Sequence, residues 1–149
     1  MAELEPDNAF WRFSLAFYAT PGVAPACLAL QDREGLDVNL VLFCCWVGVA
    51  LDRAVLAEAE ALVAEWRTEV VQKLRAVRRW LKPLPEAAGL RAAVAAQELA
   101  AEQHQQAMLH RWAMARWPDA GAVPGRHAAA NLALLTTAPE AGVLVAALG

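Results

Sequence analysis

The sequence predicts an all-helical protein: a compact single-domain bundle of six to eight helices around a buried central helix at about residues 37–50. Three observations support this fold class. Apolar side chains recur at helical spacing, residues typical of helix starts and ends divide the chain into about seven helices, and no segment shows a convincing strand pattern. A chain of 149 residues also suits one domain, which we place at 1–149.

The first two predicted helices occupy residues 9–19 and 23–35. Asp7 or Asn8 can cap the first helix, which carries a stripe of aromatic side chains. The Thr-Pro-Gly sequence that follows should end this helix and separate it from the next. Gly35 suits the left-handed residue that commonly ends a helix.

The third predicted helix follows Asp37, which is placed to act as its N-cap. Residues 40–51 form the longest apolar run of the chain, and a run of that length is shorter than the roughly 20 residues that span a bilayer. Because this helix is apolar on every side, we expect it to lie inside the bundle.

The rest of the chain predicts two long helical stretches and a short-helix tail. Residues 53–82 read either as two helices or as one kinked helix, and the sequence leaves this open. A helix over about residues 90–117 should follow the Pro-Leu-Pro break. Pro139 should separate two short helices within residues 125–148.

Charge and cysteine content narrow the setting. The net charge of −3 is too small to steer the whole molecule towards nucleic acid or an anionic membrane. The acidic start of the chain lacks the order of a signal peptide. Cys27, Cys44 and Cys45 cannot all pair within one chain, and burial should make them inert. We therefore expect a cytoplasmic protein with reduced thiols and no cofactor.

A basic stripe runs along the end of the 53–82 stretch, formed by Arg75, Arg78, Arg79 and Lys82. It could bind phosphate, nucleic acid or an acidic partner. The alternative is structural: in a helical hairpin Arg75 comes opposite Glu98, and Arg79 lies within reach of it. We favour pairing over ligand binding.

Glu98 and Glu102 are four residues apart on the long helix, so their charges repel unless something lies between them. A metal ion, a shared proton or an arginine could compensate. Di-iron bundles use Glu-x-x-His motifs, but His104 follows Glu102 by two positions, so we expect arginine and no metal.

Asp37 and Asn39 stand at the entrance to the most buried helix. Asp37 should cap that helix. Asn39 must find a hydrogen-bond partner, either inside the protein or in a ligand held in a helix-lined pocket.

The six tryptophans offer a different kind of site. Trp112 and Trp117 near the end of the long helix are either core or an apolar docking patch.

Several stretches carry a resemblance to a known family: Phe10-Trp11-x-Phe13, Pro21-Gly22-Val23, Ala26-Cys27-Leu28, Asp37-Val38-Asn39-Leu40-x-Leu42-Phe43-Cys44-x-Trp46, Trp66-Arg67, Leu74-Arg75 and Glu98-Leu99-x-x-Glu102. Over about residues 9–110 the chain resembles a small proteobacterial family catalogued only as a domain of unknown function. The resemblance implies a bacterial cytosolic setting and no particular mechanism.

We expect first a non-catalytic binding or assembly protein that acts on a protein partner or a second copy through an apolar or aromatic surface. A small-molecule binder or small enzyme with a helix-lined pocket is the alternative, and a nucleic-acid-associated protein comes third. The only serine, Ser14, lacks the surroundings of a nucleophile. The candidate binding residues are Trp11, Asp37, Asn39, Arg75, Arg79 and Glu98.

Overall fold

The computed structural model describes residues 3–149 and is all-helical, with no strand in that range. The helices in chain order are α1 (Ala9–Tyr18), α2 (Val23–Glu34), α3 (Val38–Trp46), α4 (Arg53–Trp66), α5 (Gln72–Leu81), α6 (Ala88–Arg116), α7 (Ala128–Ala133) and α8 (Glu140–Ala147). A π-helical turn, Arg67–Val71, joins α4 to α5, and a short 3₁₀ turn, Pro85–Ala87, precedes α6. The predicted fold class is therefore confirmed.

Local capping explains where the first helices begin and end. The side chain of Asn8 accepts a hydrogen bond from the amide of Trp11, and that of Asp52 accepts one from Val55 at the start of α4. Gly35 adopts φ 67° after α2 and donates its amide to the carbonyl of Gln31. This is the left-handed helix end predicted from the sequence.

The central helix is α3, whose residues from Asn39 to Trp46 are all buried. It is shorter than predicted: Trp46 is its last residue, whereas the sequence suggested about residue 50. The chain turns at Gly48, which has φ 69°. A side chain there would place its Cβ 2.8 Å from the carbonyl oxygen of Val123, so the turn requires glycine.

The stretch from α4 to α5 is one continuous helix with a π-helical turn at residues 67–71. Next to this turn the Trp66 indole donates to the carbonyl of Ala101 on α6, and its ring stacks on His104 with centroids 4.0 Å apart. A π turn inserts one extra residue into a helix. It therefore rotates the side chains of α5 about the helix axis relative to those of α4, while both helices remain packed along α6.

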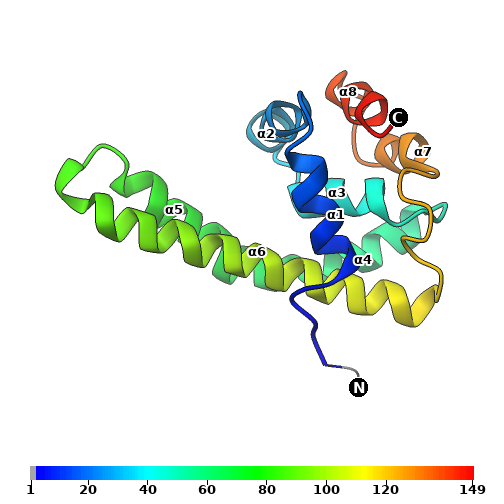
Figure 1. Ribbon diagram of the computed structural model, residues 1–149, viewed down its shortest axis with the longest axis horizontal. Helices are drawn as coiled ribbons and strands as arrows, with labels where there is room; N and C mark the ends of the chain where they lie inside the picture. Colours follow the sequence, from blue (N-terminus) through cyan, green and yellow to red (C-terminus); the bar gives the residue numbers. More distant parts are fainter. Residues whose placement is uncertain (1–2) are drawn as a thin grey trace.

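The long helices form a hairpin whose closed end projects beyond the other helices (Figure 1). In the same view α2, α7 and α8 gather on one side of α3, and α1 runs between them and α6. The apolar core is built on α3 with α1, α2 and α6 around it. This arrangement leaves a space lined by α1, α2, α5 and α6 near the start of α3, where the candidate site lies.

Two properties of residues 3–149 bear on the type of site. No single helix there is long and apolar enough to cross a membrane. Helices α1 and α2 taken together have enough length and apolar composition, but the two are bent by 100° relative to each other. In the same range no group of three or more His, Cys, Asp or Glu side chains is arranged to hold a metal ion.

Candidate functional site

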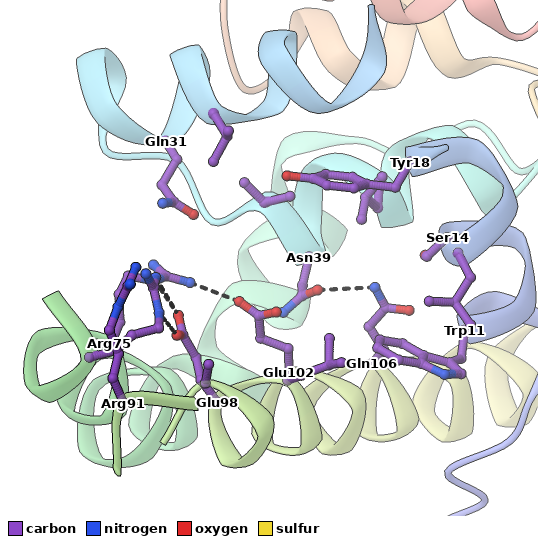
Figure 2. A pocket seen from close by; sticks show the side chains of 17 residues that line it. Trp11, Ser14, Tyr18, Gln31, Asn39, Arg75, Arg91, Glu98, Glu102 and Gln106 are labelled. Carbon is purple, nitrogen blue, oxygen red and sulfur yellow. Dashed lines mark hydrogen bonds and ion pairs between the residues drawn. The ribbon is translucent and has the colours of Figure 1, made fainter. Parts of the chain in front are cut away.

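A pocket of about 560 Å³ opens between α1, α2, the start of α3, α5 and α6 (Figure 2). Its volume falls in the range of pockets that bind small organic molecules. Helix α1 lines it with Trp11, Ser14, Leu15 and Tyr18, whose spacing places them on one helix face. The aromatic stripe predicted for α1 therefore divides between this pocket and the core.

The opposite wall is a single stripe of α6, formed by Arg91, Ala95, Glu98, Leu99, Glu102 and Gln106. At 1.5 Å of rise per residue this stripe covers about 22 Å of the helix. The pocket is therefore elongated along α6, and its two ends have different chemistry.

One end is a cluster of arginines and carboxylates. Arg75 places Nε 2.9 Å from Oε2 of Glu98 and Nη2 2.9 Å from Oε1 of Glu102. Arg78 also binds Glu98, through Nε to one carboxylate oxygen and through Nη2 to the other at 3.3 Å. The Glu98 side chain is 8% exposed and that of Arg75 14%, so this ion-pair network is largely removed from water. The arginine expected between the two glutamates is Arg75.

The two glutamates differ in protonation behaviour although they are one helical turn apart. Burial alone would raise the pKa of Glu98, but the hydrogen bonds and charges of Arg78 and Arg75 outweigh it and lower that pKa. The pKa of Glu102 is raised, chiefly by burial and secondarily by the charge of Glu98, which Arg75 only partly offsets. Glu98 is therefore the firmly ionised member of the pair.

Arg91 lines the same end of the pocket from α6. Its Nε is buried and has no hydrogen-bond partner within the described part of the chain. With Arg75 and Arg78 it makes three guanidinium groups facing two carboxylates. When both glutamates are ionised, this end of the pocket carries an excess of one positive charge.

The other end of the pocket is neutral and polar. Asn39 accepts a hydrogen bond through Oδ1 from Nε2 of Gln106, at 3.0 Å. The Oε1 of Gln106 and the hydroxyl of Ser14 are buried without a partner among residues 3–149. Figure 2 shows Trp11, Ser14 and Gln106 together at this end, opposite Arg75 and Arg91. An unpaired buried polar group costs about 1–3 kcal/mol, so this end favours a hydrogen-bonding occupant.

Apolar side chains with large exposed fractions also line the pocket. Leu15 is 52% exposed, Leu28 47%, Leu99 51% and Tyr18 37%. They come from three helices and converge on one opening. Four large apolar side chains around a concave site form the kind of exposed patch that marks a binding surface.

Of the six predicted binding residues, the structure gathers four around this pocket: Trp11, Asn39, Arg75 and Glu98. The other two lie elsewhere. Asp37 caps α3 through the amide of Asn39 at 3.0 Å and lines a smaller neighbouring cavity. Its pKa is raised by burial, against the opposing charge of Arg67.

The second arginine on Glu98 is Arg78, so the expectation that Arg79 would share this carboxylate is wrong. Instead, Nη2 of Arg79 lies 3.5 Å from Oδ1 of Asp32 on α2. Positions 78 and 79 are both one turn from Arg75, so spacing alone could not separate them. The rotation of α5 against α6 decides between them, and it brings Arg78 inward.

Sequence reasoning missed Arg91 altogether. The signal was available, because Arg91 precedes Glu98 by two helical turns and therefore shares its face of α6. Ser14, which was considered only as a nucleophile, and Gln106, to which no role was given, also line the pocket. The basic stripe splits: Arg75 and Arg78 are engaged by carboxylates, while Arg79 and Lys82 are exposed.

A sequence-family model with the description "Protein of unknown function (DUF2390)" matches residues 9–109. The chain belongs to this family. The matched span runs from the start of α1 into the last third of α6 and includes every residue that lines the pocket. Comparison with curated proteins and comparison with solved structures each gave no match.

Proposed function

We propose that this protein is a non-catalytic binding protein whose pocket between α1, α2, α5 and α6 holds a small organic molecule. The observation that carries the proposal is the pairing, in one pocket of about 560 Å³, of a charged end with an opening of exposed apolar side chains. The sequence alone favoured a protein partner first. The pocket geometry moves the small-molecule alternative ahead of it.

The side chains that line the pocket support binding of a ligand. Covering the exposed apolar surface of Leu15, Leu28 and Leu99 would contribute roughly 25 cal/mol for each Å² removed from water. The Ser14 hydroxyl and the Gln106 carbonyl oxygen are buried without a partner in the described part of the chain, and a polar group of a ligand at this end would offer them one. Both gains require a molecule that fits a concave site lined by several helices.

A pair of tryptophan substitutions on α6 tests this proposal. Ala95 lines the pocket and is half-buried, whereas the neighbouring Ala96 is exposed and does not line it. We expect Ala95→Trp to fill the pocket and abolish binding of hits from a small-molecule library, measured by ligand-observed NMR. The matched control, Ala96→Trp, should retain binding. Hits that bind both variants equally would place the binding site elsewhere and refute the proposal.

Self-association is a second candidate function, favoured by one observation at the closed end of the helical hairpin. All six tryptophans are described, and among them only Trp80 is exposed, at 71%. Val77 and Leu90 beside this end of the hairpin are also exposed. We expect Trp80→Gln to shift a dimer towards monomer in sedimentation velocity. A wild-type protein that stays monomeric at high micromolar concentration would exclude this candidate.

A further inference from the structure

We infer that the ligand is a carboxylic acid with an elongated apolar body, and that Arg91 receives its carboxylate. This inference deepens the proposed function, because it names the class of molecule that the same pocket takes. It rests on three features: the charge balance at the charged end of the pocket, the position of Arg91 at that end, and the aliphatic wall that runs from that end towards the other.

The charge balance leaves one guanidinium to spare. Arg75 and Arg78 are held by Glu98 and Glu102 through hydrogen bonds, whereas Arg91 forms no ion pair within the described part of the chain. Its Nε is buried and has no hydrogen-bond partner among residues 3–149. A half-buried guanidinium beside two others is unfavourable unless an anion joins them. Glu98 and Glu102 are already engaged by Arg75 and Arg78, so a ligand supplies the anion that pairs with Arg91.

A single negative charge fits this site better than a double one. Three arginines against two glutamates leave an excess of one positive charge. A carboxylate cancels that excess and matches the two-pronged donor geometry of a guanidinium. A phosphate dianion would exceed it and would lie close to Glu98 and Glu102, which would repel the additional charge.

The apolar body follows from the walls between the two polar ends. Aliphatic side chains from four helices line this part of the pocket: Leu15, Leu28, Val38, Leu42 and Leu99. Because the pocket runs along α6, a molecule anchored at Arg91 would extend past Leu99 towards Asn39 and Trp11. A straight aliphatic chain is the simplest body that contacts these side chains along this path.

Isothermal titration with decanoate, used below its micelle concentration, tests the inference on the full chain. We expect Arg91→Gln to weaken decanoate binding by at least about tenfold, because a hydrogen bond between two charged groups is lost. Arg91 makes no ion pair within residues 3–149, so the variant should fold as the wild type does, which circular dichroism and a thermal melt can check. The control Arg53→Gln removes the same charge from an exposed position on α4 and should leave affinity unchanged.

A series of head groups on the same chain separates failure of this inference from failure of the proposed function. Decanoate should bind more tightly than decanol, decylamine or decyl phosphate, and Ala95→Trp should abolish its binding. If decanol binds as tightly as decanoate and Ala95→Trp blocks both, the pocket binds apolar molecules and the carboxylate inference is wrong. Tighter binding of decyl phosphate, or unchanged affinity in Arg91→Gln, would also overturn it. If no decyl compound binds, the inference fails, and the library screen alone decides the proposed function.

Discussion

Nε of Arg75 lies 2.9 Å from the carboxylate of Glu98, and this contact joins α5 to α6 at the charged end of the pocket. The Glu98 side chain is buried, and that of Arg75 is 14% exposed. The same pair therefore has two consequences. It holds the hairpin of long helices together, and it fixes the wall against which a ligand would lie.

Replacing Glu98 with glutamine should destabilise the protein substantially. The substitution keeps the shape of the side chain but leaves Arg78 without a carboxylate and Arg75 with Glu102 alone. Because removing one partner of a buried ion pair leaves an uncompensated charge, we expect a loss of about 3 kcal/mol in the free energy of unfolding, measured by urea denaturation.

Glu69→Gln is the matched control for this prediction. Glu69 pairs with Lys73 at positions i and i+4, and both side chains are more than half exposed. Exposed pairs of this kind contribute little, so the loss should be well under 1 kcal/mol. Equal losses in the two variants would show that burial of the Glu98 cluster does not matter for stability.

The fold could be predicted from the sequence because its signals are local. Asn8, Asp52 and Gly35 cap or end helices through contacts within a few residues, and the uniform apolarity of α3 marks it as central. Gly48 likewise adopts a left-handed φ of 69° just after α3, but it lies inside the apolar run of residues 40–51, and the sequence therefore extended the predicted helix past it. The close approach of Val123, which requires glycine at position 48, comes from far along the chain and has no signal near Gly48 in the sequence.

The site was only partly predictable for a related reason. Opposing charges in a hairpin gave the Arg75–Glu98 pair, because loop position fixes which residues face each other along the helices. The choice of Arg78 over Arg79 depends on helix rotation, and a π turn between α4 and α5 contributes to that rotation. Such a turn has no clear sequence signature, so the inward arginine could not be assigned.

The two glutamates should affect the pH dependence of stability in opposite directions. The folded pKa of Glu98 is lowered from its ordinary 4.5, so its stabilising contribution is present above that value and is lost as pH falls through the lower folded pKa. The difference in unfolding free energy between wild type and Glu98→Gln should therefore be largest near neutral pH and should shrink in acid. Urea denaturation from about pH 3 to about pH 8 measures it.

Glu102→Gln should show the reverse trend. The folded pKa of Glu102 is raised, so ionising it costs more in the folded protein than in the unfolded chain. As pH rises from below 4.5 through the raised pKa, this variant should gain stability relative to wild type. A parallel pH trend in the two variants would contradict the assignment of different protonation behaviour to the two carboxylates.

The three cysteines should be unreactive in the folded protein. Burial raises the pKa of Cys27 and of Cys44 to about 12, and it raises the pKa of Cys45 as well. At pH 8 a thiol with that pKa is ionised in roughly one molecule in ten thousand. We expect almost no reaction with Ellman's reagent under native conditions, and three equivalents of thiol after denaturation in guanidinium. A native cysteine that reacts as fast as free cysteine would show that its helix opens readily.

Two glycine-to-alanine substitutions should change stability in opposite directions. At Gly121, φ is 75° and an added Cβ would lie 2.3 Å from ring atoms of Trp46, which is itself stacked on Phe10 and cannot move aside freely. Gly121→Ala should therefore cost about 3 kcal/mol, because it combines backbone strain with overpacking. Gly142 lies inside α8 with nothing within 4 Å of an added Cβ, so Gly142→Ala should stabilise the protein by about 0.5–1 kcal/mol. Thermal and urea denaturation of both variants would test this. A Gly121→Ala protein as stable as wild type would contradict the packing of the loop after α6 against Trp46, which covers the core at that end of α3.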